Sequence, residues 1–293
     1  MATKQTYPTG VRPLLVEEAA RRRRVETKFV ETLEAAGFAE VVLPIIDYAD
    51  PYAALVDRAA ARQSYRFVDR EGDLVAIRSD FTPMVARALA PALDSAQLPL
   101  RLFYRGDVIR CEASRLGTNR ELFQIGAEIV GDGSIDADVE VLRLAAAIAR
   151  SFGIEPLVVY NDVAIADSLG ADARETLVTK RPAQPAPPLV AKLVDGSATL
   201  DDVRAYLPSR DAATRLASIG AALGDDDAFA LHLDDVDASS GYYTGLRFRL
   251  HAAGSRRLLA QGGRYDSLYG RFGTPAPAVG FTFTLDELIP EMD

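Results

Sequence analysis

Residues 260–288 read AQGGRYDSLYGRFGTPAPAVGFTFTLDEL and contain the features on which the rest of the fold depends. A pair of glycines at 262–263 leads into Arg264 and Tyr265, and a Gly/Pro-rich loop then precedes a predicted buried strand over 278–284. Two consecutive glycines let a ligand approach the main chain closely, while the arginine and the tyrosine supply a planar cation and a ring. The segment therefore predicts either a pocket wall at a strand end or a β-bulge beside a salt-bridged arginine.

Length and composition are those of an ordinary globular protein. The 293 residues are 48% hydrophobic and 26% charged, which suits one large α/β or α+β unit with an insertion. No apolar run approaches the ~20 residues that span a bilayer, and residues 1–5 lack the apolar core of a signal peptide, so we expect a soluble, cytoplasmic protein without a membrane segment. The single cysteine, Cys111, excludes an internal disulfide, and because His232 and His251 are the only histidines we expect no metal site.

The charge balance is acidic. The formal net charge is −9 and the pI is about 4.9. Proteins that grip nucleic acid usually carry a basic surface, so we expect no nucleic-acid partner. The one dense basic run, four arginines at 21–24, lies inside a helical pattern that follows Glu17 and Glu18. We interpret it as a solvated or ion-paired helix face.

The first hundred residues alternate between helical and strand patterns. Gly37 is expected to cap the first helix, and Pro44 places the following strand at a sheet edge or a subunit interface because proline donates no ladder hydrogen bond. Asp80 and Thr82 precede the second helix, where either side chain could cap that helix or face a ligand. The predicted elements are a helix over 16–36, a strand over 41–46, a hairpin of strands over 65–69 and 74–77, and a helix over 84–90.

The strands that follow carry an unusual set of polar residues. By the strand period of two, Arg110 and Glu112 share one face of an outgoing strand, and Gln124 and Glu128 share one face of the returning strand. Polar side chains on one sheet face are costly in a core unless they bind something, although a half-exposed sheet would also explain them. The predicted strands here cover 100–104, 108–112 and 121–131.

A segment of different character lies in the second half of the chain. Residues 165–224 hold helical fragments joined by several prolines and Gly196, and their apolar residues keep helical spacing. We therefore predict a core domain over 1–164 and 225–293 with a small helical insertion over 165–224. The helical fragments cover 173–179, 186–194, 200–206 and 212–223, and the other predicted elements are a helix over 136–152 and strands over 157–160, 230–233, 245–251, 257–260 and 279–284.

Four segments together resemble a known family. Residues 103–112 (FYRGDVIRCE) and 120–128 (RELFQIGAE) are similar to the second motif of class II aminoacyl-tRNA synthetases in its histidine-specific form. Residues 241–245 (GYYTG) and 262–266 (GGRYD) resemble the two histidine-specific signatures of that family. The resemblance covers almost the whole chain in order, and it implies an α+β fold in which helices flank an antiparallel sheet, with a small helical insertion.

The first and third motifs of the family also have counterparts. Pro44, after its helix and strand, suits the first motif, and residues 278–288 suit the third. Because the first motif builds the subunit interface in the family, the resemblance implies a homodimer core.

Departures from the family bear on function. The family has an arginine four residues before its paired tyrosines, which handles the substrate carboxylate and the activated phosphate, and this sequence has Ala238 there. The third motif holds an arginine that grips ATP phosphate, and Glu287 takes its place. An anionic side chain near a triphosphate reverses the sign of an interaction worth about 4 kcal/mol at ~4 Å and an effective dielectric of ~20. We expect no adenylate formation, and no anticodon-binding domain because the sequence ends at Asp293.

The combination of a retained amino-acid pocket and an altered ATP site is similar to the regulatory branch of this family. Its members assemble with the short-form catalytic subunit of ATP phosphoribosyltransferase in histidine biosynthesis and mediate feedback inhibition by histidine. The resemblance implies a non-catalytic subunit of a hetero-oligomer, with histidine as its effector and no cofactor. The alternative is a histidyl-tRNA synthetase-like enzyme that uses ATP, which Ala238, Glu287 and the expected lack of an anticodon-binding domain disfavour.

The resemblance further implies a set of histidine-binding residues and no catalytic residue. Asp80 would receive the α-amino group with help from Thr82. Arg110 could hold the carboxylate, since Ala238 cannot, or could instead pair with Glu112. The residues that would line the ligand backbone or surround its imidazole are Gln124, Glu128, Tyr243 and Tyr265. Histidine could also sit chiefly at the interface with the catalytic subunit.

Overall fold

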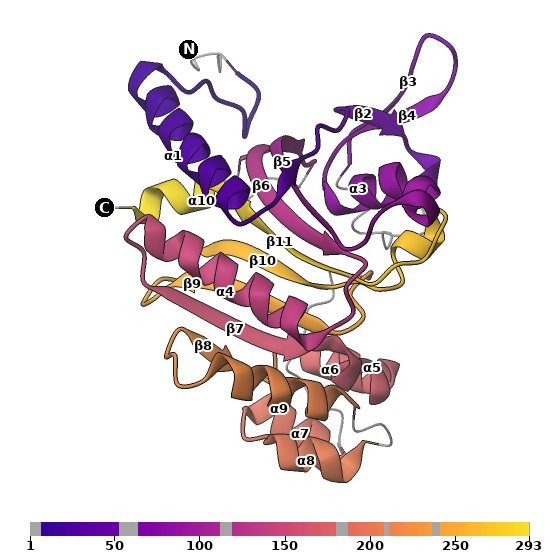
Figure 1. Cartoon of the computed structure of the whole chain (residues 1–293), viewed down its shortest axis with the longest axis vertical. Helices are drawn as coiled ribbons and strands as arrows, with labels where there is room; N and C mark the ends of the chain where they lie inside the picture. Colours follow the sequence, from indigo (N-terminus) through magenta and orange to yellow (C-terminus); the bar gives the residue numbers. More distant parts are fainter. Residues whose placement is uncertain are drawn as a thin grey trace, which may run out of the picture.

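The computed structural model describes residues 7–52, 64–111, 119–179, 187–207, 211–235 and 241–292. Its main element is a mixed eight-stranded sheet (Figure 1). The strands of this sheet lie in the order β1 (Ala39–Glu40), β5 (Leu100–Ile109), β6 (Glu121–Val130), β11 (Ala278–Thr284), β10 (Leu258–Arg264), β9 (Leu246–Ala252), β7 (Pro156–Asp162) and β8 (Phe229–Leu231). A separate three-stranded sheet has the order β2 (Ile46–Tyr48), β4 (Leu74–Ile77) and β3 (Arg66–Val68).

The pairing of the large sheet agrees with the predicted class. Its six central strands pair antiparallel throughout, and the edge strands β1 and β8 pair parallel to their neighbours β5 and β7. The predicted α+β fold with an antiparallel sheet flanked by helices is therefore confirmed, with one parallel strand added at each edge.

Helices account for most of the remaining described chain. The α-helices are α1 (Val16–Ala35), α3 (Thr82–Leu89), α4 (Ile135–Ser151), α5 (Val163–Ser168), α6 (Ala171–Thr179), α7 (Pro188–Asp195), α8 (Leu200–Tyr206), α9 (Asp211–Leu223) and α10 (Leu285–Leu288). Short 3₁₀ turns are η1 (Asp50–Tyr52), η2 (Ala90–Ser95), η3 (Tyr269–Arg271) and η4 (Ile289–Glu291).

Alternation along β11 separates the two faces of the large sheet. Phe281 and Phe283 point into the main apolar cluster, beneath helices α1 and α4 (Figure 1). The ring of Phe29 in α1 meets that of Phe283 edge-on at 5.1 Å, and both side chains are fully buried. Full burial of one such side chain stabilises the fold by roughly 1.5–3 kcal/mol. The Thr282 side chain points to the opposite side of the sheet, and Gly280 lies on that side as well. We call this side the open face.

Helix α3 walls off part of the open face. Phe81, just before the helix, stacks on Tyr104 of β5 with ring centroids 4.5 Å apart and planes 11° from parallel. Both rings are almost completely buried in a small apolar cluster that also contains Val85. The helix therefore stands beside the sheet and leaves a cavity between them.

The predicted strand over 41–46 is wrong. The chain instead leaves the large sheet after β1, where the Val41 amide still donates to the Phe103 carbonyl at 2.8 Å, and enters the small sheet at β2. Pro44 lies in the irregular stretch between them, where its missing amide hydrogen breaks the ladder. The 41–46 run thus connects the large sheet to the small sheet.

Several other element boundaries also differ from the sequence prediction, and β10, predicted over 257–260, runs on to Arg264. The strands predicted over 100–104 and 108–112 form one continuous strand, β5, which ends at Ile109, and Glu112 lies outside the described residues. Gly106 allows the continuity because it has a φ of +147° and packs against the side chain of Arg78. Helix α3 begins at Thr82, two residues earlier than predicted.

The helices of the predicted insertion pack as part of the main body. Leu177 of α6, Leu189 of α7 and Leu216 of α9 are almost completely buried in the same apolar cluster as the sheet residues. The helical spacing correctly indicated α6 to α9, whereas the six-residue α5 was not foreseen because Asp162 caps it directly at the end of β7. The division into a core over 1–164 and 225–293 and an insertion over 165–224 stays a prediction.

The arginine run in α1 is an ion-paired helix face, as predicted. Arg22 pairs with Asp107 at 3.1 Å and Arg23 pairs with Glu26 at 2.9 Å. Arg21 donates to main-chain carbonyls of η4 and of the residue that follows it. In the part of the chain that the structure describes, no helix is long and apolar enough to cross a membrane, and no three His, Cys, Asp or Glu side chains are grouped to hold a metal ion.

Candidate functional site

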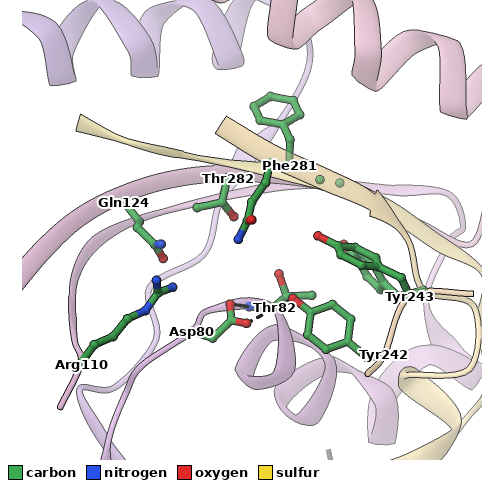
Figure 2. Close-up of a pocket in the computed structure, with 12 residues that line it drawn as sticks. Asp80, Thr82, Arg110, Gln124, Tyr242, Tyr243, Phe281 and Thr282 are labelled. Atoms are coloured by element: carbon green, nitrogen blue, oxygen red, sulfur yellow. Dashed lines mark hydrogen bonds between the residues drawn. The ribbon is translucent and has the colours of Figure 1, made fainter. Parts of the chain in front are cut away.

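A pocket opens on the open face, between α3, the central strands and the segment before β9. It encloses about 340 Å³ of space free of protein atoms, counting the part open to solvent. We call it the Asp80 pocket (Figure 2). Its walls are formed by Asp80, Thr82, Arg110, Gln124, Tyr242, Tyr243, Gln261, Gly262, Tyr265, Gly280, Phe281 and Thr282. Six of the seven residues expected to bind histidine are among them.

Asp80 carries a carboxylate on the floor of this pocket. One oxygen accepts from the Thr82 amide at 3.3 Å, and the other accepts from the Tyr242 hydroxyl at 3.2 Å. Phe81 occupies the N-cap position of α3, so the expectation that Asp80 or Thr82 would be the cap residue is wrong, although Asp80 does bind the first helical amide. The carboxylate is held by two neutral donors and can accept further hydrogen bonds from a cation.

Arg110 and Gln124 form the wall opposite the tyrosines. The Arg110 guanidinium points toward Gln124 and the cavity (Figure 2), and its Nε donates to the Ser79 carbonyl at 3.3 Å. Gln124 is 4% exposed, and its Oε1 is buried without a hydrogen-bond partner among the described residues. A half-exposed sheet therefore does not account for Gln124. The alternative pairing of Arg110 with Glu112 lies outside the described residues.

Three tyrosine rings form the other wall. Tyr242 meets Tyr265 edge-on with centroids 5.9 Å apart, and Tyr243 lies 5.1 Å from Tyr242 and 6.4 Å from Tyr265. Burial raises the pKa of Tyr242 and of Tyr265 well above the usual value, so both phenols stay neutral. The negative faces of such rings attract an ammonium or an imidazolium group.

Gly280 makes room for this arrangement. A Cβ at position 280 would lie 2.5 Å from the Ala127 carbonyl oxygen and 2.8 Å from the Tyr265 hydroxyl. Only a residue without a side chain fits there. The Tyr265 hydroxyl itself has no hydrogen-bond partner among the described residues although it is buried.

Glu128 lies behind the pocket and is not one of its wall residues. Its side chain is completely buried on β6, where Oε2 accepts from the Tyr269 hydroxyl at 3.3 Å and Oε1 lacks a partner among the described residues. Burial is the largest cause that raises the pKa of Glu128 to about 8, and the Asp80 carboxylate adds to the rise. At pH 7 the group is therefore mostly protonated and neutral. A half-exposed sheet therefore does not account for Glu128 either.

Arg264 proves to be a structural residue. Its side chain is 1% exposed and pairs with Asp138 of α4 at 2.7 Å and with Asp266 at 3.1 Å. Two main-chain carbonyls before α4 accept its remaining hydrogens. The sequence allowed either a pocket wall or a salt-bridged arginine in the 262–266 segment, and both are present. Arg264 forms the salt bridge, while Gly262 and Tyr265 contribute to the pocket wall.

Sequence reasoning missed several wall residues. Tyr242 was overlooked although it directly precedes Tyr243. Gln261 and Thr282 are cross-strand neighbours on β10 and β11, so the period of two would have placed them on one face once the register was known. That register is a tertiary property, and nothing local in the sequence specifies it.

A larger depression, with an empty volume of about 920 Å³ counting the part open to solvent, adjoins the Asp80 pocket and contains the altered third-motif residue. We call it the Glu287 depression, and it shares Arg110, Gln124, Gln261 and Thr282 with the Asp80 pocket. Glu287 is bound by Arg257 at 2.7 Å, and both side chains are about 40% exposed. Arg257 also pairs with Glu291 at 3.0 Å, so it offsets only part of the negative charge at this end of the depression. Ala238 lies outside the described residues.

Comparisons with known proteins now identify the family. A family model described as Histidyl-tRNA synthetase matches residues 10–180 and 171–288. A protein of Geobacter metallireducens named ATP phosphoribosyltransferase regulatory subunit is 31% identical over 98% of this chain and 73% of its own length. The chain belongs to the family of ATP phosphoribosyltransferase regulatory subunits. The resemblance inferred from the sequence motifs is confirmed.

Other members of the regulatory-subunit family support the assignment. A protein of the same name from Anaeromyxobacter dehalogenans is 33% identical over 96% of this chain and 89% of its own length. A solved structure from Bacillus halodurans, described as an ATP phosphoribosyltransferase regulatory subunit/histidyl-tRNA synthetase, superposes with a TM-score of 0.84. It covers 100% of this chain and 84% of its own at 24% identity, and so shows the shared fold.

Proposed function

We propose that this chain is a non-catalytic regulatory subunit of an ATP phosphoribosyltransferase of histidine biosynthesis and that it binds histidine in the Asp80 pocket. The observation that carries the proposal is the convergence of Asp80, Arg110 and the three tyrosine rings on one pocket of a family member. A carboxylate, a guanidinium and an aromatic wall suit the three parts of an amino acid with a cationic or aromatic side chain.

Each wall group has a proposed partner on the ligand. The ammonium group binds Asp80, with Thr82 beside it, and the carboxylate binds the guanidinium of Arg110. Gln124 lines the ligand backbone opposite these groups. The imidazole lies among Tyr243 and Tyr265, and the buried, mostly protonated Glu128 lies behind these rings.

Regulation in this proposal acts through assembly with a short-form catalytic subunit. Histidine can inhibit only if it binds one state of the hetero-oligomer more tightly than another, typically by about 1–3 kcal/mol. Catalysis resides on the partner, which agrees with the regulatory names of the relatives and with an ATP locus that holds the Arg257 to Glu287 ion pair.

A homodimer core is part of the same proposal. The irregular stretch around Pro44 and the small sheet expose apolar side chains, which include Val42 at 88%, Ile45 at 58% and Val68 at 65%. Apolar side chains gathered on one surface favour a protein partner. Sedimentation of the chain alone at several concentrations tests for the dimer.

A second candidate is an ATP-using enzyme of the histidyl-tRNA synthetase type. The Glu287 depression favours it, because it opens beside the Asp80 pocket and presents Arg110 and Arg256. ATP–pyrophosphate exchange in the presence of histidine would establish this candidate and remove the non-catalytic assignment.

The experiment that tests the main proposal is a calorimetric titration. Purified protein is titrated with histidine and separately with ATP, and the histidine titration is repeated with a short-form catalytic subunit present. We expect histidine to bind with an affinity that the partner changes, and ATP not to bind. The control is the variant Asp94→Ala, since Asp94 is exposed in η2, away from the pocket walls. No histidine binding with or without the partner would contradict the proposal.

A further inference from the structure

A second pocket lies on the same open face, where β7 and β9 meet helix α6. Its empty volume is about 710 Å³, counting the part open to solvent, and it shares none of its described wall residues with the Asp80 pocket. Arg249 in its wall is the cross-strand neighbour of Gln261 in the wall of the Asp80 pocket. Adjacent strands are about 4.8 Å apart, so the two pockets are neighbours along the sheet. We call the second one the Arg249 pocket.

The guanidinium of Arg249 is incompletely satisfied. It pairs with Asp235, which also accepts from Arg247 at 3.5 Å. Asp235 is the more buried partner of this pair, at 15% exposure against 29% for Arg249. The Nε of Arg249 is buried with no hydrogen-bond partner among the described residues. A guanidinium in this state favours an added anionic oxygen.

Both histidines of the chain line this pocket. The Nδ1 of His251 lies 3.0 Å from the Arg257 carbonyl, which can only accept, so Nδ1 carries the proton and Nε2 is left for a ligand. His232 is half exposed, and its Nδ1 lies 3.8 Å from Asp234. A phosphate monoester, whose second ionisation lies near pH 6, can share a proton with such imidazoles.

The remaining wall fits an organic body with hydroxyl groups. Val159 of β7 with Leu177 and Val178 of α6 forms an apolar side. Asp234 stands at the rim, one-third exposed, and a carboxylate there accepts hydrogen bonds from hydroxyl groups. A bare inorganic ion would use only the Arg249 end.

We propose that the Arg249 pocket is a second small-molecule site, which binds a sugar phosphate, either free or as part of a nucleotide. The phosphate lies against Arg249 and the two imidazoles, a sugar hydroxyl donates to Asp234, and the apolar side covers the rest of the ligand. This site does not depend on histidine binding in the Asp80 pocket.

The two histidines make the test selective. Because the chain has no others, every imidazole carbon–proton resonance in an NMR spectrum of histidine-labelled protein reports on this pocket. The protein is titrated with ribose 5-phosphate, with AMP and with inorganic phosphate. We expect saturable shifts of both imidazoles by at least one organic phosphate with a Kd below about 1 mM, and binding of inorganic phosphate at least about tenfold weaker.

Variants complete the experiment. Arg249→Gln should weaken binding of the organic phosphate at least about tenfold. Val178→Glu, at a position 38% exposed and therefore tolerant of change, should weaken it as well by placing a negative charge on the apolar side. The matched control is Arg204→Gln on α8, which removes a surface arginine that pairs with Asp201 and is not a wall residue of the pocket, and it should change nothing.

The possible outcomes of the titration lead to different conclusions. Ribose 5-phosphate and AMP binding equally would assign recognition to the sugar phosphate, and AMP binding alone would assign it to the nucleotide. No saturable shift with any probe, or shifts unchanged by both Arg249→Gln and Val178→Glu, would overturn the site. Equal affinity for inorganic phosphate would overturn the role given to Asp234 and the apolar side.

Discussion

The Asp80 pocket and the Glu287 depression share four wall residues but satisfy their polar groups in opposite ways. Around the Asp80 pocket, Gln124 Oε1, Glu128 Oε1 and the Tyr265 hydroxyl are buried without partners in the described chain. Beside the depression, Arg257 pairs with Glu287 at 2.7 Å and with Glu291 at 3.0 Å. An unsatisfied buried polar group costs about 1–3 kcal/mol. A ligand in the Asp80 pocket can recover part of this cost at Gln124 and Tyr265, which are wall residues. The comparison favours a ligand site in the Asp80 pocket.

The largest expected effect concerns the protonation of Glu128. Its pKa of about 8 in the folded protein exceeds the unfolded value of 4.5, so the folded state binds the proton more tightly. This stabilisation is full below pH 4.5 and is lost as the pH rises through 8, by up to about 1.4 kcal/mol per unit. Glu128→Gln should remove about 3 kcal/mol of pH dependence between pH 5.5 and 8. Denaturant unfolding at several pH values measures it.

The same slope in wild type and Glu128→Gln would show that Glu128 is ionised in the folded protein. The pocket would then hold a permanent buried charge, and the contrast with the depression would fail.

A somewhat smaller effect is expected from Asp80→Ala. Removal of the carboxylate should weaken histidine binding at least about 30-fold, because hydrogen bonds to charged groups contribute about 1.5–3 kcal/mol. Calorimetry measures the affinity, and feedback inhibition of the assembled transferase should weaken in parallel while assembly is kept. Tyr265→Ala should act in the same direction. Inhibition unchanged in both variants would place the histidine site elsewhere, at the interface with the catalytic subunit.

Gly280→Ala tests the packing beneath the tyrosines. The new methyl group would meet the Ala127 carbonyl at 2.5 Å and the Tyr265 hydroxyl at 2.8 Å, so we expect a loss of about 2 kcal/mol in the free energy of unfolding. Gly133→Ala is the matched control, since its nearest contact would be Pro277 at 3.6 Å. Equal melting temperatures for the two variants would contradict this expectation. They would mean that β11 and β6 can move apart without loss of unfolding free energy.

The smallest effects are expected in the Glu287 depression. Glu287→Gln breaks an ion pair whose members are about 40% exposed, and such surface pairs contribute roughly 0–1 kcal/mol. Glu287→Arg should not restore ATP use, because Ala238 still supplies no cation. Pyrophosphate exchange measures this, and adenylate formed by that single variant would overturn the assignment of a non-catalytic subunit.

Much of the fold could be predicted because its signals are local. Helical spacing predicted α1, α4 and the helices of the insertion. A hairpin signal predicted β4, and apolar runs predicted β6 and β11, each to within one residue at each end. The sequence did not predict that the 41–46 run would connect two sheets. An apolar stretch does not by itself specify which strands it will pair with.

The candidate site divides in the same way. The residue types of Asp80, Arg110, Gln124, Tyr243 and Tyr265 and their motif order predicted an amino-acid pocket, and the sequence alone determined that Ala238 and Glu287 depart from the synthetase pattern. Which residues face the cavity was decided only by the tertiary structure. Cross-strand register puts Gln261 and Thr282 in the pocket wall. Glu128 is buried behind the wall, and Arg264 forms a buried ion pair with Asp138. The physical reason is that side-chain chemistry is local, whereas desolvation and pairing depend on neighbours far apart in the chain.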